Sequence, residues 1–248
     1  MRIAAIYDIH GNLPALEAAF EDISEAGVDQ VVVGGDVLPG PMPRETIAFL
    51  RNLTLPLQFI SGNGEAAVLE QLAGREPVAV PEQFRPVIHW TAEQLDPEDQ
   101  QLLASWVKTL RIEIPKLGAV LFCHATPRSD TEIFTRVTAE EGLLPAFAGV
   151  DAAIVVCGHT HMQFDRMVGG IRVVNAGSVG MPFGEPGAYW LLLEPDIQLR
   201  RTAYDLSMAA ERIRKTSYPQ AAEFAAHNIM QPPSEEKVLE LFSRAELR

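Results

Sequence analysis

Several features that would place a protein in a particular class are scarce in this sequence. Its 248 residues include only two cysteines, Cys123 and Cys157, so no disulfide framework can form and we expect a reducing compartment. No run approaches about 18 apolar residues, which excludes a membrane-spanning helix. The first strand-like run reaches Asp8 too early for a secretory signal peptide. We therefore predict a cytoplasmic protein whose two cysteines are buried as small hydrophobic residues.

Positive charge is also scarce, because 20 lysines and arginines face 33 aspartates and glutamates, a net charge of -13. Such a surface repels phosphate backbones and anionic lipids, so we expect neither bulk nucleic-acid binding nor a membrane partner. A small phosphate-bearing substrate would need a local positive charge, which a metal ion could supply. Hydrophobic residues make up 47% of the chain, enough for a core, which excludes a mainly disordered protein. The sequence does not indicate an oligomeric state.

The first sixty residues alternate between strand-like and helical patterns. Asn12 is a candidate cap for a helix that Gly27 ends. Strand–helix–strand alternation predicts a parallel sheet with right-handed crossovers. The expected strands are Ile3 to Tyr7, Val31 to Val33 and Leu57 to Ile60, with a second helix over Arg44 to Leu53.

Residues 66–109 carry helical patterns only, and we interpret them as a helical insertion with Trp90 and Trp106 in its core. Its clearest helix is predicted over Pro97 to Leu110, after the capping residue Asp96. The insertion could cover the metal site or pack on the flank of the sheet, and the sequence leaves both open. Strands are then predicted over 111–114, 119–123, 152–157, 163–168, 171–174, 189–193 and 197–204, with a helical tail over 205–248.

Polar side chains follow the predicted strands at the points where these end. Asp8 and His10 are two residues apart, so in an extended segment both can approach one ion. Ligands collect at the carboxyl ends of parallel strands. Imidazole, carboxylate and amide groups without thiolate suit Mn, Fe, Zn or Ni. Seven candidates are too many for one ion and suit two ions that share a carboxylate; they are Asp8, His10, Asp36, Asn63, His124, His159 and His161.

These motifs occur in a familiar order. Asp8-Ile9-His10-Gly11-Asn12, Gly35-Asp36, Gly62-Asn63, His124 and Gly158-His159-Thr160-His161 resemble the motifs of the calcineurin-like metallophosphoesterases. The sequence is most similar to the small prokaryotic phosphodiesterase branch, and the resemblance spans residues 1 to about 204. It implies an α/β fold, a two-sheet β-sandwich flanked by helices in four layers (α/β/β/α). Residues 1–204 would form this domain with the insertion, and residues 205–248 a helical extension of it.

The resemblance also implies how the ligands are divided between two divalent ions, with manganese the first expectation. One ion would take Asp8, His10, Asp36 and His161, and the other Asp36, Asn63, His124 and His159, so that Asp36 bridges both. A hydroxide between the ions would attack phosphorus in line, while the ions neutralise the developing charge.

The third motif departs from the family pattern. Many relatives read Gly-Asn-His-Glu, and their histidine is associated with protonating the leaving group, whereas this sequence reads Gly62-Asn63-Gly64-Glu65. Glu65 could be a substitute acid, but an acidic residue in a first helical turn is the favoured interpretation. The departure puts general-acid protonation of the leaving group in doubt and argues against the protein-phosphatase branch.

Two further residues, Arg128 and Asn12, have a functional and a structural interpretation. Arg128 could bind substrate phosphate or be an ordinary surface arginine. Asn12 could contact substrate or only cap its helix. His89 and His227 match no motif and are interpreted as structural.

Three functions remain open from the sequence. The first is a metal-dependent phosphodiesterase acting on a small phosphoester. The second is a phosphomonoesterase or nucleotide hydrolase on the same site, and the third is a binding scaffold of this fold without turnover. Because every ligand position is filled, the sequence favours a working enzyme.

Overall fold

Strand β1 (Ile3–Ile6) is the central strand of the first of two five-stranded sheets in a computed structural model that describes residues 1–247. The strand order is β10-β9-β1-β2-β3. The parallel partners are β2 (Gln30–Val33) and β3 (Leu57–Phe59), connected through α1 (Leu13–Glu25) and α2 (Pro43–Arg51). The antiparallel partners are β9 (Ala188–Leu193) and β10 (Ile197–Thr202). The predicted parallel start of the chain is confirmed.

The second sheet has the order β4-β5-β6-β8-β7. Its three inner strands are parallel, and each edge strand is antiparallel to its neighbour. The predicted hairpin at Gly169-Gly170 is confirmed, since it joins β7 to β8. The bounds are β4 (Thr109–Ile114), β5 (Gly118–Cys123), β6 (Ile154–Cys157), β7 (Phe164–Val168) and β8 (Ile171–Asn175).

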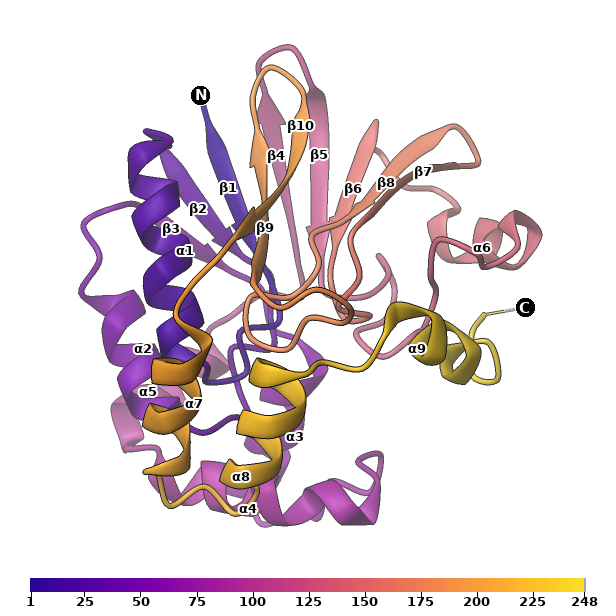
Figure 1. Cartoon of the computed structure of the whole chain (residues 1–248). Helices are drawn as coiled ribbons and strands as arrows, with labels where there is room; N and C mark the ends of the chain where they lie inside the picture. Colours follow the sequence, from indigo (N-terminus) through magenta and orange to yellow (C-terminus); the bar gives the residue numbers. More distant parts are fainter. Residues whose placement is uncertain (248) are drawn as a thin grey trace.

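Side chains of β1 alternate between two cores, which makes the sheets stack face to face. Ile3 and Ala5 pack between the sheets with Phe122 of β5, whereas Ala4 and Ile6 pack under α1. Helix α6 (Glu140–Phe147) covers the outer face of the second sheet, opposite α1 (Figure 1). The four-layer α/β/β/α arrangement is therefore confirmed. Both cysteines are free and buried, as expected.

The insertion starts earlier and ends earlier than the sequence pattern indicated. Helix α3 begins at the ligand Asn63 itself, and the predicted helix over 97–110 is wrong beyond Ala104. Trp106 stacks on Phe59 with ring centroids 4.8 Å apart, and Val107 forms a β-bridge with Ile60. This segment is therefore extended beside the sheet and not helical. The helices are α3 (Asn63–Leu72), the 3₁₀ turn η1 (Glu82–Phe84), α4 (Arg85–Gln94) and α5 (Pro97–Ala104).

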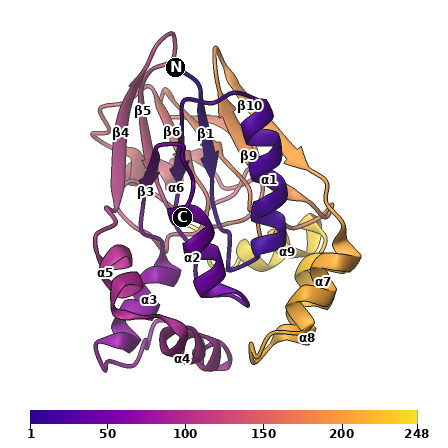
Figure 2. The same ribbon diagram turned by 90° about the vertical axis from the view of Figure 1, so that its left-hand side faces the viewer.

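The tail is helical, as predicted, apart from residue 248, which lies outside the described residues. Its helices are α7 (Leu206–Arg214), α8 (Ala221–Phe224), the π-helical η2 (Ala225–Met230) and α9 (Glu235–Phe242). Val87 of α4 joins their hydrophobic cluster, and Trp90 packs edge-on against Tyr218 at 5.4 Å. The insertion and the tail thus pack on each other beyond one end of the sheets (Figure 2). Within residues 1–247, no helix is long and apolar enough to cross a bilayer.

Candidate metal centre

All seven predicted ligands meet where β1, β2, β5 and β6 end. The ligand atoms of Asp8, His10 and His161 lie within 4.8 Å of one another, as do those of Asp36, His124 and His159. Asn63, the first residue of α3, places Oδ1 3.1 Å from Nε2 of His124. These two groups correspond to the division that the resemblance implies, with Asn63 in the second group.

The backbone at this site is strained. Among the described residues, six non-glycine residues have positive φ angles, and Lys116 is the sole one outside the site. Left-handed backbone costs an L-residue free energy and persists where the surroundings impose it, often at functional sites. Hydrogen bonds between neighbouring loops impose it here: the amide of His10 donates to Asp36 O at 2.9 Å. The strained ligands are Asp8 (54°), His10 (48°), Asp36 (51°), His159 (66°) and His161 (57°).

Three imidazoles are oriented by main-chain carbonyl oxygens. In each ring Nδ1 lies within hydrogen-bond distance of a carbonyl, so Nδ1–H donates and Nε2 is directed at the site. The pairs are His10 with Pro39 O (3.3 Å), His124 with Gly34 O (3.0 Å) and His161 with Met181 O (2.8 Å).

The geometry fits cations between these groups. Nε2 of His10 and Nε2 of His161 lie 3.2 Å apart, and two unprotonated nitrogens at that distance repel unless a proton or metal ion lies between them. In the described residues, Oδ1 of Asp8 is buried without a hydrogen-bond partner. A buried carboxylate oxygen without a donor is costly unless it binds a cation. The donor set therefore fits divalent metal ions.

Asp36 lies between the two groups of ligands. Its Oδ2 is 3.7 Å from Nε2 of His10 and 3.5 Å from Nε2 of His124. Burial would raise the pKa of Asp36, but the charge and hydrogen bond of His124 outweigh it and hold that pKa well below its usual range. Burial likewise opposes protonation of His124, yet Asp36 and Asp8 raise its pKa to about 10. Without metal, a proton on His124 takes the cation's place.

Glu65 fixes the Asp36 loop to the start of α3. Its buried carboxylate accepts hydrogen bonds from the amides of Asp36 (2.9 Å), Leu38 (2.9 Å) and Gly62 (2.8 Å). Burial and the charge of Asp36 raise the pKa of Glu65 to about 7. Its position in the first turn of α3 agrees with the favoured interpretation. Sequence reasoning missed the tertiary role, since the three bonded amides come from two separate loops.

Gly64 explains why the third motif has no histidine. A Cβ atom at this position would lie 2.1 Å from the carbonyl oxygen of Leu38. The amide of Gly64 also donates to Oδ1 of Asp36 at 2.7 Å, which keeps the helix start close to this carboxylate. A histidine cannot occupy position 64 unless this backbone moves.

The two candidate substrate contacts both have structural partners. Asn12 is fully buried; its side chain accepts from Ala15 N at 3.3 Å, capping α1, and donates to Gly180 O at 2.9 Å. Arg128 lines a small hollow beside His124, but its guanidinium donates twice to Glu132, at 2.8 and 2.6 Å.

A larger pocket opens over His10, Asp36 and Asn63, and the tail supplies one wall of it. His227, interpreted as structural from the sequence, lines this pocket together with Glu223 of α8. The signal in the sequence is the spacing of one helical face: Gln220, Glu223, Phe224, His227 and Asn228.

Two stacked mixed sheets with carboxylate, imidazole and amide ligands at their strand ends define a class of metal-binding α/β proteins. Within that class, the chain belongs to the calcineurin-like phosphoesterase superfamily, whose domain model matches residues 1–196. The resemblance found in the sequence is thereby confirmed.

Individual relatives agree with this membership. The uncharacterized protein MJ0912 of Methanocaldococcus jannaschii is 29% identical over 244 residues, which cover 88% of this chain and 94% of that protein. A metallophosphoesterase structure from Sphaerobacter thermophilus has a TM-score of 0.70 at 29% identity and covers 91% of this chain and 99% of its own. The hypothetical protein PH1004 from Pyrococcus horikoshii OT3 has the same fold, with a TM-score of 0.78 at 21% identity. The match covers 94% of this chain and 99% of that protein.

Proposed function

We propose that the chain is a dinuclear metal-dependent phosphodiesterase. The observation that carries this proposal is the position of Asp36 between two groups of ligand atoms, each of which suits one ion. When bound, two divalent ions, Mn²⁺ before Fe, Zn or Ni, would activate water for in-line attack and neutralise charge on the phosphate.

The residues of the chain hold and orient this centre. Asp8, His10 and His161 would hold one ion; Asn63, His124 and His159 would hold the other, with Asp36 shared. The main-chain carbonyls on Nδ1 keep each Nε2 directed at the site before metal arrives. Such preorganisation lowers the cost of binding metal and substrate.

The charges around the site favour diesters over monoesters. A diester carries one negative charge at neutral pH, whereas a monoester carries close to two. In the described part of the chain, no lysine or arginine lines the pocket over His10 and Asp36, and Arg128 is engaged by Glu132. A second phosphate charge would therefore lack a cationic side chain, at a cost of about 1–3 kcal/mol, or about tenfold to hundredfold in rate.

The experiment compares metal content and paired substrates. The metal-free protein is reloaded with Mn²⁺, its bound ions are counted, and its activity is measured on bis(4-nitrophenyl) phosphate and 4-nitrophenyl phosphate. We expect two ions per chain and at least about tenfold higher kcat/KM for the diester. Preference for the monoester would support the monoesterase alternative. Full metal loading without hydrolysis of either ester would leave the scaffold alternative and overturn the proposal.

A further inference from the structure

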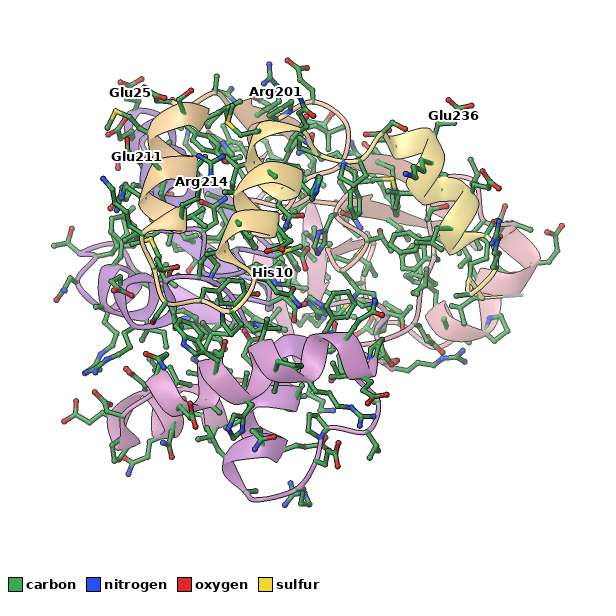
Figure 3. All side chains as sticks on the ribbon, turned by 60° about the horizontal axis from the view of Figure 1, so that its bottom comes forward. His10, Glu25, Arg201, Glu211, Arg214 and Glu236 are labelled. Atoms are coloured by element: carbon green, nitrogen blue, oxygen red, sulfur yellow. The ribbon has the colours of Figure 1, made fainter. Side chains whose placement is uncertain are left out.

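The pocket over the metal centre has a volume of about 510 Å³, within the range of small-molecule sites. Its floor is formed by His10, Asp36 and Asn63. One wall comes from residues 79–88 of the insertion, and the other from residues 218–228 of the tail. In Figure 3, His10 lies between the helices of the tail and those of the insertion.

The two walls are fixed to each other. Tyr218 packs edge-on against Trp90, and Gln220 donates through Nε2 to the carbonyl oxygen of Gln83 at 3.2 Å. Val87 of α4 is buried in one cluster with Phe224 of α8. The pocket is thus held by a hydrophobic cluster beneath its walls, which favours a preformed binding site.

The tail wall is one continuous helical face. Five of its six lining residues follow the spacing i, i+3, i+4, i+7 and i+8, across the change from α8 to the π-helix η2. Single π-helical turns occur frequently at functional sites. The tail lies beyond residue 196, where the family domain model ends, so this wall is an addition to the family's shared domain. The residues are Gln220, Glu223, Phe224, His227 and Asn228.

The walls are mainly apolar and carry a few polar side chains, among them Glu223 and His227 of the tail. Val80, Phe84 and Ile88 line the insertion side. Neither lysine nor arginine occurs among the lining residues of the described chain, and the tail wall carries the acidic Glu223. A flat or aliphatic group would bury apolar surface here, whereas a phosphate away from the metal centre would meet neither lysine nor arginine and would face the carboxylate of Glu223.

We propose that this pocket binds an organic group of the substrate, and that this group is neutral, apolar or aromatic, and carries no second phosphate. The inference rests on the proposed function, because the phosphate itself must lie on the metal ligands of the pocket floor. It adds the chemical class of the substrate: a singly phosphorylated diester with an apolar ester group. Phosphoesters that carry a further phosphate on that group are excluded.

Binding of three non-hydrolysable ligands to the Mn²⁺-loaded protein tests the pocket without turnover. All three ligands carry the same metal-binding phosphonate group. Methylphosphonate has no ring, phenylphosphonate has a ring, and benzene-1,4-bisphosphonate has a ring with a second phosphonate. By calorimetry we expect phenylphosphonate to bind about tenfold to hundredfold more tightly than methylphosphonate. The bisphosphonate should bind no more tightly than phenylphosphonate.

Variants identify the pocket as the cause. Phe84 is 44% exposed, so Phe84→Ala should leave the fold intact and reduce the phenyl-to-methyl affinity ratio several-fold. Leu199→Ala is the matched control, since Leu199 is 45% exposed on β10 and does not line the pocket. Gln220→Lys should tighten binding of the bisphosphonate selectively.

The outcomes separate the two proposals. Equal affinities for methyl- and phenylphosphonate, or the same ratio in wild type and Phe84→Ala, would overturn the pocket assignment even if diesters are hydrolysed. The expected ratios in a protein that hydrolyses no diester would support the pocket and overturn the proposed function.

Discussion

Replacing Glu65 removes the acceptor of three buried main-chain amides. These amides belong to Asp36, Leu38 and Gly62, and their distances to the carboxylate are 2.8–2.9 Å. Because Glu65 is fully buried, water cannot replace the lost acceptor without entering the site.

The magnitude follows from the number of hydrogen bonds. Each of the three buried donors left without a partner costs about 1–3 kcal/mol, so Glu65→Ala should lower the free energy of unfolding by about 3–9 kcal/mol. For a chain of this length that corresponds to a fall in Tm of about 10 °C or more. Glu65→Gln retains one oxygen but turns an NH₂ group toward a main-chain donor. We expect this substitution to lower the free energy of unfolding by about 1–3 kcal/mol.

Urea unfolding of the metal-free and Mn²⁺-loaded proteins measures these effects. Glu21→Ala is the control, because Glu21 is exposed in the middle of α1 and should change stability by less than about 0.5 kcal/mol. Both Glu65 variants should also bind Mn²⁺ more weakly, since the Asp36 loop loses its anchor. If Glu65→Ala unfolds like the control and keeps its metal affinity, the argument that Glu65 positions Asp36 is refuted.

Four further outcomes are expected. Asp36→Asn should lower the occupancy of both metal sites together, measured by elemental analysis of folded protein; loss of a single ion would contradict the bridging position. The raised pKa of His124, about 10, stabilises the metal-free protein fully below pH 6.5 and is lost as pH rises toward 10, so its Tm should fall over that window. Metal displaces that proton, so Mn²⁺ affinity should rise about tenfold per pH unit between pH 7 and 9, measured by calorimetry. Aryl diesters should be cleaved about 10²–10⁴-fold faster than alkyl diesters, and Gly64→His, which clashes with Leu38, should destabilise the protein without closing that gap.

The sequence identified residues that the structure brings together in the candidate metal centre because their signal is local. Asp8 and His10 follow an apolar run directly, and the same holds for His159 and His161, so periodicity alone places them at strand ends. The roles of Glu65 and the tail residues depend on tertiary partners, which no local pattern encodes. The misplaced end of the helix over 97–110 has the same origin, because contacts of Trp106 with β3 override the local helical pattern.

Stability and function oppose each other in the five ligands with left-handed backbone. Left-handed backbone costs each of these residues on the order of 1 kcal/mol, so the chain maintains the geometry of this site at the expense of its own stability. We therefore expect laboratory evolution toward heat resistance, without selection for metal binding, to admit substitutions at these positions. Selection for thermostable variants of this protein should therefore include an activity measurement at every round.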